Sequence, residues 1–226
     1  MTWGLNQSLE TEYLYDANGN MITDYNKDRE VSYNFLNLPK TVTNTSTHQV
    51  IHYQYTATRE KLSQKLSSMQ GRGTRRDYAG PFVYVNNQLA WINLPRGRWV
   101  YTGKELKAEL HLHDHLGNVR MVLEESDNSL VSVQQASYYP FGKAIHELSS
   151  SLPDPESTLD NRYLYNRKLE RSGNPDSSGE FQADFGLDWY DYGARFYDAE
   201  TSRCANCLAK RILIIAMHLA VVFILP

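Results

Sequence analysis

Three aromatic triplets organise the first part of this chain: Tyr13-Leu14-Tyr15, Tyr33-Asn34-Phe35 and Tyr53-Gln54-Tyr55. Their aromatic pairs recur at a spacing of 20 residues, and the same shift carries Ile22 onto Val42 and then onto Leu62. Side chains two positions apart in a strand point to the same face of a sheet. Each unit is therefore predicted to hold a strand with two aromatic rings on one side, then a turn, and then a second strand with an aliphatic anchor.

Turn-forming residues fall between these strands. The segments are Asp16-Ala17-Asn18-Gly19-Asn20 and Asn37-Leu38-Pro39, whose residue types supply the backbone angles of a reversal. A unit of this length cannot bury its aromatic face alone, so neighbouring units must stack. The sequence predicts an all-β fold, in which antiparallel hairpin repeats form a continuous β-ribbon or solenoid.

Composition supports this class and excludes others. The chain of 226 residues contains 16 Tyr, a residue that suits half-buried pleated surfaces, and its 41% of hydrophobic residues can form a core. A net charge of −3 provides no general field that would attract nucleic acid or anionic lipid. Only two cysteines are present, so no disulfide framework is expected, and residues 1–15 lack the pattern of a secretory signal.

Further hairpins are predicted downstream. Asn86-Asn87 is expected to turn the chain within 82–91, and Gly117-Asn118 is expected to form a two-residue loop between strands at 110–115 and 119–123. The basic run 71–76 reads as an exposed, solvated connection. Segments 149–160 and 172–179, rich in Ser, Pro and Asp, are expected to be long surface loops.

Several motifs resemble one known family. The three aromatic units, with Asp16–Asn20 after the first, are similar to the YD repeats of the Rhs (rearrangement hotspot) family. Later motifs, in the family's order, resemble its repeat-associated core domain: His113-Asp114-His115-Leu116-Gly117-Asn118-Val119-Arg120, then Tyr138-Tyr139-Pro140-Phe141-Gly142, then the run from Asp184 to Asp198 that contains Trp189-Tyr190-Asp191-Tyr192-Gly193-Ala194-Arg195-Phe196-Tyr197.

This resemblance implies a division of the chain and a role. Residues 1–70 would hold YD repeats and 71–198 the core region. The family's shells resemble a cocoon around a C-terminal toxin, so the chain is expected to be a non-enzymatic structural fragment of such a shell, secreted or at the cell surface. Its implied partners are the remainder of the shell or an encapsulated toxin, and neither nucleic acid nor a cofactor is expected.

The pattern of the family stops after Asp198. Residues 199–226 lack the Gly-Arg-aromatic run and the Asp-Pro element that related core domains carry there, so we expect an aberrant tail from a frameshift or a truncated frame. The tail ends in an apolar run at 212–225, which is shorter than the roughly 20 residues of a spanning helix. It gives only a weak expectation of membrane contact.

Four groups of residues have side chains suited to a chemical site, but we expect no catalytic, cofactor-binding or metal-binding residue among them. A strand could place three imidazoles on one face for a metal-dependent enzyme. Paired acids could act as in glycosidases. A Cys-x-x-Cys pair is half of a zinc or redox motif, and exposed aromatic rings could bind cell-surface or cell-wall carbohydrate. The three imidazoles are those of His111, His113 and His115, and the paired acids are Asp184, Asp188, Asp191 and Asp198. The cysteine pair is Cys204 and Cys207, and the aromatic rings are those of Tyr138, Tyr139, Trp189 and Tyr190.

Overall fold

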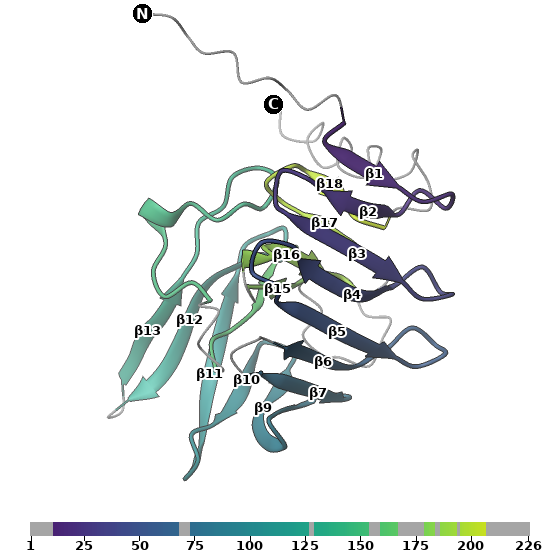
Figure 1. Ribbon diagram of the computed structural model, residues 1–226. Coiled ribbons are helices and arrows are strands. Elements are labelled where there is room, and N and C mark those ends of the chain that lie inside the picture. Colours follow the sequence, from purple (N-terminus) through teal and green to yellow (C-terminus); the bar gives the residue numbers. More distant parts are fainter. Residues whose placement is uncertain are drawn as a thin grey trace, which may run out of the picture.

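The computed structural model describes residues 11–67, 73–126, 129–153, 159–166, 179–183, 186–193 and 195–206. Over these residues the chain forms two sheets in which each strand is antiparallel to the next along the chain (Figure 1). The predicted all-β class and the antiparallel hairpins are confirmed. His146–Leu148 forms a 3-10 turn and Gly186 is also in 3-10 conformation, and no helix among the described residues is long and apolar enough to cross a membrane.

The large sheet contains thirteen of the described strands in sequence order. Its strands are β1 (Tyr13–Tyr15), β2 (Met21–Asp24), β3 (Arg29–Tyr33), β4 (Pro39–Asn44), β5 (Val50–Tyr55), β6 (Lys61–Ser67), β7 (Arg75–Ala79), β8 (Phe82–Val85), β9 (Gln88–Leu94), β10 (Gly97–Tyr101), β11 (Leu106–His113), β12 (Val119–Ser126) and β13 (Ser129–Gln135).

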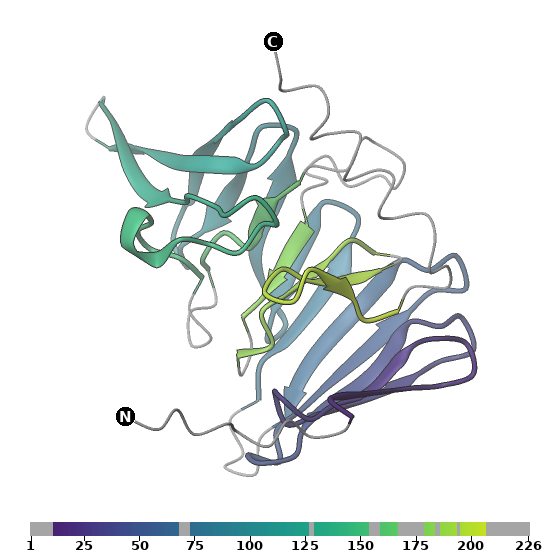
Figure 2. The same ribbon diagram turned by 90° about the horizontal axis from the view of Figure 1, so that it is seen from above.

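The small sheet has five described strands and lies inside the curve of the large one (Figure 2). Its strands are β14 (Tyr163–Tyr165), β15 (Gly179–Gln182), β16 (Trp189–Asp191), β17 (Phe196–Asp198) and β18 (Arg203–Cys204). β18 belongs to the segment expected to be an aberrant tail, and it continues this sheet beside β17. A bridge between Asn20 and Asn206 then brings the chain back to β2.

Four of the hairpins share one five-residue loop. It occurs at Asp16–Asn20, Asn34–Leu38, Thr56–Glu60 and Asp114–Asn118, and in each copy the first N–H donates to the fifth carbonyl at 2.9 Å. A side-chain oxygen of the first residue also accepts the fifth N–H. The fourth residue has a positive φ in every copy, from 58° to 80°, which explains Gly19 and Gly117.

This loop corrects the predicted register of the repeat. The residues that precede the loop are Tyr15, Tyr33 and Tyr55, which pair with Met21, Pro39 and Lys61. The structural spacings are therefore 33 − 15 = 18 and 55 − 33 = 22 residues, and not 20 twice.

Two residues of the predicted units consequently lie outside the core. Phe35 lies in the loop after β3 and is 89% exposed, and Leu62 is 45% exposed. The predicted aromatic pair on one face is wrong for the second unit, because the loop fixes the register and the aromatic spacing does not.

Of the other local predictions, one is confirmed and two are wrong. The Asn86-Asn87 turn is confirmed, with φ values of 49° and 68°. The two-residue loop at Gly117-Asn118 is wrong, since β11 ends at His113 and the five-residue loop follows. The prediction that the basic run 71–76 is an exposed connection is wrong for its last two residues, because Arg75 begins β7 and Arg76 is buried.

The two predicted surface loops are described in part. Residues 154–158 and 172–178 lie outside the described residues, and Gly179 belongs to β15 rather than to a loop.

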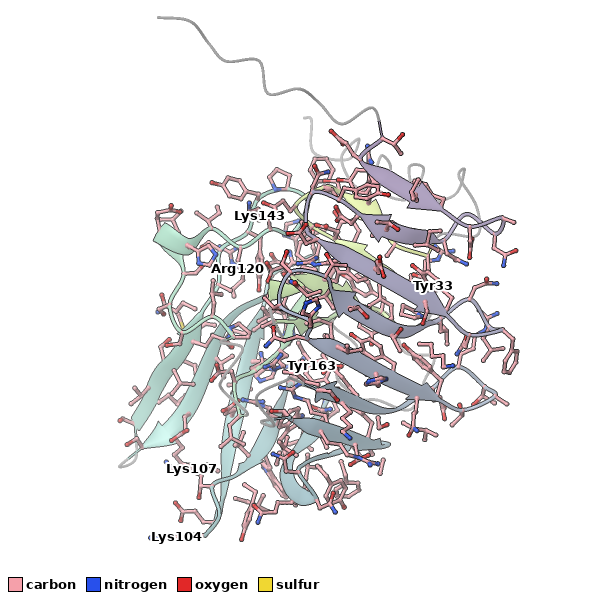
Figure 3. The ribbon with its side chains drawn as sticks, viewed as in Figure 1. Tyr33, Lys104, Lys107, Arg120, Lys143 and Tyr163 are labelled. Atoms are coloured by element: carbon pink, nitrogen blue, oxygen red, sulfur yellow. The ribbon has the colours of Figure 1, made fainter. Side chains whose placement is uncertain are left out.

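The core lies where the two sheets face each other. Leu187, Trp189 and Phe196 of the inner segment pack with Val42 and Ile51 of the large sheet, and all five are fully buried. A second cluster joins Trp91 of β9 to Tyr163 of β14, which lies near the centre of the molecule (Figure 3). The hairpins of the large sheet thus obtain their interior from the small sheet and from one another.

Candidate functional site: a buried charge cluster between the sheets

Three charged side chains meet in the space between the sheets. Lys61 begins β6 of the large sheet, while Glu180 and Asp191 lie on β15 and β16 of the small sheet. Lys61 Nζ is 2.7 Å from Asp191 Oδ2 and also contacts Glu180 Oε2. Side-chain exposure is 9% for Lys61, 6% for Glu180 and 3% for Asp191, so the cluster is almost dry.

The repeat explains how a lysine reaches this place. The residue that follows the five-residue loop begins a strand and faces the interior, and in the other copies it is Met21, Pro39 or Val119, all buried. Lys61 occupies the same position in the third unit. Its ammonium lies 4.5 Å from the centre of the Tyr78 ring, which adds a cation–π contact.

The two carboxylates face each other across a strand pair. Glu180 and Asp191 are direct partners in the β15–β16 ladder. Like charges at such positions repel, since the Cβ atoms of direct partners are about 4.5–5.5 Å apart. Lys61 from the opposite sheet lies against both carboxylates, so docking of the sheets offsets this repulsion.

Electrostatics couple the three groups. Burial alone would raise the pKa of Glu180, but the Lys61 ammonium and its hydrogen bond hold that pKa below the usual value. Burial would likewise lower the pKa of Lys61, and the two carboxylates raise it well above the usual value instead. Removing one member would leave an uncompensated charge in a dry interior, which is strongly destabilising.

Other cations of the large sheet also hold the inner segment. Arg29, which is buried, donates from Nη1 to the Leu187 carbonyl at 2.7 Å, contacts the Gly186 carbonyl and lies 5.9 Å from the Trp189 ring centre. Lys27 Nζ is 2.7 Å from Asp198 Oδ2. The inner surface of the large sheet therefore binds the small sheet through side-chain cations as well as through apolar packing.

A cavity of about 230 Å³ with a mixed polar and apolar lining lies over β10 to β13. Buried Arg98 lines it, donates from Nε to Glu109 Oε2 at 2.6 Å, and binds the carbonyls of Leu159 and Asp160. His111 Nε2 is 3.8 Å from Glu109 Oε2. The Arg98 charge is thus engaged by protein groups, which indicates that it fastens segment 159–161 to the sheet. Lys104 and Lys107 lie at the far end of the β10–β11 hairpin (Figure 3), where Lys107 Nζ is 2.7 Å from Glu124 Oε1.

The three-imidazole site is not formed. His111 is buried, the ring centre of His113 lies 6.3 Å from that of His111, and His115 is exposed in the loop after β11. The strand ends at His113 after an irregularity in its pairing, so the expected single face does not exist. Among the described residues, no three His, Cys, Asp or Glu side chains gather in a way suited to a metal ion.

The proposed carbohydrate platform is also wrong as a set. Trp189 and Tyr190 are buried at 0% and 1% exposure, and the Tyr138 hydroxyl donates to the Val119 carbonyl at 2.7 Å. Only Tyr139 of the four is exposed, at 51%. Trp189 packs against the large sheet, whereas Tyr190 points to the other face of the small sheet and packs with Tyr138, Tyr165 and Tyr197.

The three acids that the structure describes do not pair with one another. Asp191 pairs with Lys61 and Asp198 with Lys27, so each serves docking of the sheets, while Asp188 adopts a positive φ before β16. Asp184 lies outside the described residues.

The cysteine pair and the apolar tail are described only in part. Cys204 is in β18, whereas Cys207 and the apolar run at 212–225 lie outside the described residues.

Sequence reasoning missed Lys61 and Glu180. The available signal was the position after the loop, where Lys61 replaces an apolar residue, but the 20-residue register hid that position. Glu180 carried no local signal, because its partner is 119 residues away in the chain.

In comparisons with known proteins, no family model and no curated protein matches the chain.

Proposed function

We propose that this chain is a non-enzymatic structural fragment of a shell of the Rhs/YD-repeat type, and that its role is enclosure. The observation that supports this most is the large sheet itself. Its consecutive hairpins, four of them turned by the same loop, form one curved layer. This layer has no hydrophobic core of its own and buries its inner face only against what it surrounds. A wall built of repeated units that stack on their neighbours has this construction.

The outermost described strands support extension of the wall. β1 and β13 lie at the two ends of the large sheet. An outer strand presents backbone groups that can pair with further strands. β13 also exposes Val131 and Val133 on one face, at 47% and 37%, and Leu130 on the other face, at 61%. Exposed apolar side chains of this kind suit a strand that another layer covers. By the family resemblance, the remainder of the shell would supply these strands and an encapsulated toxin would be the content.

Electron cryo-microscopy of the gene product isolated from its own cells tests this proposal. We expect the two-sheet unit to form part of a continuous wall, with the large sheet extended at β1 or β13 and density enclosed by the wall. A two-sheet unit that stands free, with both outer strands facing solvent and no enclosing wall, would contradict the proposal.

A further inference from the structure

The geometry of the buried cluster points to a covalent bond: we propose that Lys61 and Asp191 condense to an intramolecular amide, with Glu180 as the proton carrier. The bond would join β6 of the large sheet to β16 of the small sheet, across 130 positions of the chain. The proposal rests on the contacts of these side chains and does not depend on the proposed shell.

The reacting groups are already in contact. Lys61 Nζ lies 2.7 Å from Asp191 Oδ2, so the nitrogen is beside the carboxyl group whose carbon it would attack. Positioning of this kind converts a slow bimolecular condensation into an intramolecular step. Asp191 lies in a regular antiparallel pair with Glu180, and Lys61 pairs with Tyr55 at a register shift in the β5–β6 ladder.

A backbone donor serves the second oxygen of Asp191. The Gly193 N–H donates to Asp191 Oδ1 at 2.7 Å. When the nitrogen adds to the carboxyl carbon, negative charge develops on Oδ1, and a fixed N–H at this distance stabilises it. The two oxygens of Asp191 thus have different surroundings, with Oδ1 beside an oxyanion donor and Oδ2 beside the amine.

Glu180 is placed to move protons between the reactants. Its Oε2 contacts Lys61 Nζ, and its strand position is directly opposite Asp191. Its Oε1 accepts a hydrogen bond from the Tyr78 hydroxyl at 2.8 Å, which fixes the carboxylate. A positioned carboxylate within reach of both groups can act first as a general base and then as a general acid.

The step balances without any added reagent. Glu180 takes one proton from the Lys61 ammonium and passes it to Oδ2, and the neutral amine then adds to Cγ of the protonated Asp191, leaving the negative charge on Oδ1. The addition product loses its second nitrogen proton to Glu180, which passes it to Oδ2. The C–Oδ2 bond breaks, the C–N bond is complete, and Oδ2 departs as water. Glu180 ends as the carboxylate with which it began.

A second lysine–aspartate pair provides an internal comparison. Lys27 Nζ is also 2.7 Å from its carboxylate, Asp198 Oδ2, but the neighbouring acid Glu200 is 48% exposed and binds Lys143 as well. Asp198 Oδ1 accepts the N–H groups of Glu200 and Thr201 and so caps a turn. Because the neighbouring acid is exposed, water reaches this pair, and we expect it to remain an ion pair.

Intact-mass spectrometry of the full chain under denaturing conditions tests the proposal. We expect the purified protein to be lighter than its sequence by one water, and its tryptic digest to contain one branched peptide that joins Lys61 to Asp191. Glu180→Gln and Lys61→Arg should both restore the full mass, because the first cannot carry protons and the second offers no amine. The matched control Lys27→Arg should keep the loss of water.

Two results would overturn the proposal. One is the full sequence mass in wild-type protein whose near-ultraviolet dichroism shows ordered tyrosines. The other is loss of water that maps to any pair except Lys61 and Asp191, or that persists in Glu180→Gln. The mass result leaves the shell proposal untouched, and electron cryo-microscopy of the wall leaves the amide proposal untouched, so the two can fail separately.

Discussion

Tyr33 joins the two sheets through one hydroxyl group. It donates to the Met21 carbonyl at 2.8 Å and to the Ala205 carbonyl at 3.1 Å, at the point where the strand after the first loop meets β18. We expect Tyr33→Phe to lower the free energy of unfolding by about 1–2 kcal/mol, because two carbonyls lose a partner. Urea unfolding followed by tyrosine fluorescence measures this change.

The matched control for that variant is Tyr15→Phe. Tyr15 holds the same place in the first unit but is 49% exposed, so its variant should stay within about 0.5 kcal/mol of the wild type. Equal effects of the two variants would contradict the role given to Tyr33.

Asp114 shows how one carboxylate shapes a loop. Its Oδ1 accepts the N–H groups of Leu116 and Asn118, and its Oδ2 accepts the Asn118 amide. We expect Asp114→Ala to destabilise the protein by about 1–3 kcal/mol, since the backbone N–H and the side-chain amide of buried Asn118 then lose their acceptors. Asp114→Asn should cost less, because Asn34 begins the same loop in the second unit. Thermal unfolding of both variants checks the order, and a milder effect of alanine would contradict it.

At the scale of elements, Gly97 controls the approach of β10 to β11. A Cβ at this residue would overlap the Glu109 carbonyl oxygen of the neighbouring strand. We expect Gly97→Ala to cost about 2–4 kcal/mol through separation of these strands.

Gly103→Ala serves as the control for that variant. Gly103 has a φ of 89° but open space around its Cβ position, so alanine there should cost only about 1–2 kcal/mol of backbone strain. Hydrogen exchange of β10 and β11 measures both variants, and an undisturbed β11 in Gly97→Ala would show that the close approach is unimportant.

The elements also show how far the sequence could predict the structure. The β8–β9 hairpin followed from Asn86-Asn87, because two residues with positive φ fix a tight turn locally. The register of the repeats did not follow, because aromatic spacing cannot reveal a five-residue loop held by side-chain hydrogen bonds. The cluster of Lys61, Glu180 and Asp191 was beyond local patterns, since docking of one sheet on another selects its partners.

At the scale of the whole molecule, buried tyrosines couple stability to high pH. Burial raises the pKa of Tyr55, Tyr78 and Tyr190 well above the usual value. Above about pH 10 the unfolded chain releases these protons while the folded chain retains them, so stability falls as pH rises. We expect the tyrosinate absorbance of the buried rings to appear together with loss of near-ultraviolet dichroism.

The urea-unfolded chain is the reference for that titration. Its tyrosines should ionise together near their ordinary value of about 10. Full ionisation at the same pH in native buffer, with the dichroism intact, would show that the rings are not enclosed.

The account as a whole depends on the small sheet being enclosed by the large one as a single cooperative unit. Hydrogen–deuterium exchange of the full chain tests this most directly, because enclosed strands open only with global unfolding. We predict that the amides of β16 and β17 exchange at the same slow rate as those of β4 and β5, whose core residues they contact. Rapid exchange of β16 and β17 while β4 and β5 remain protected would contradict the account.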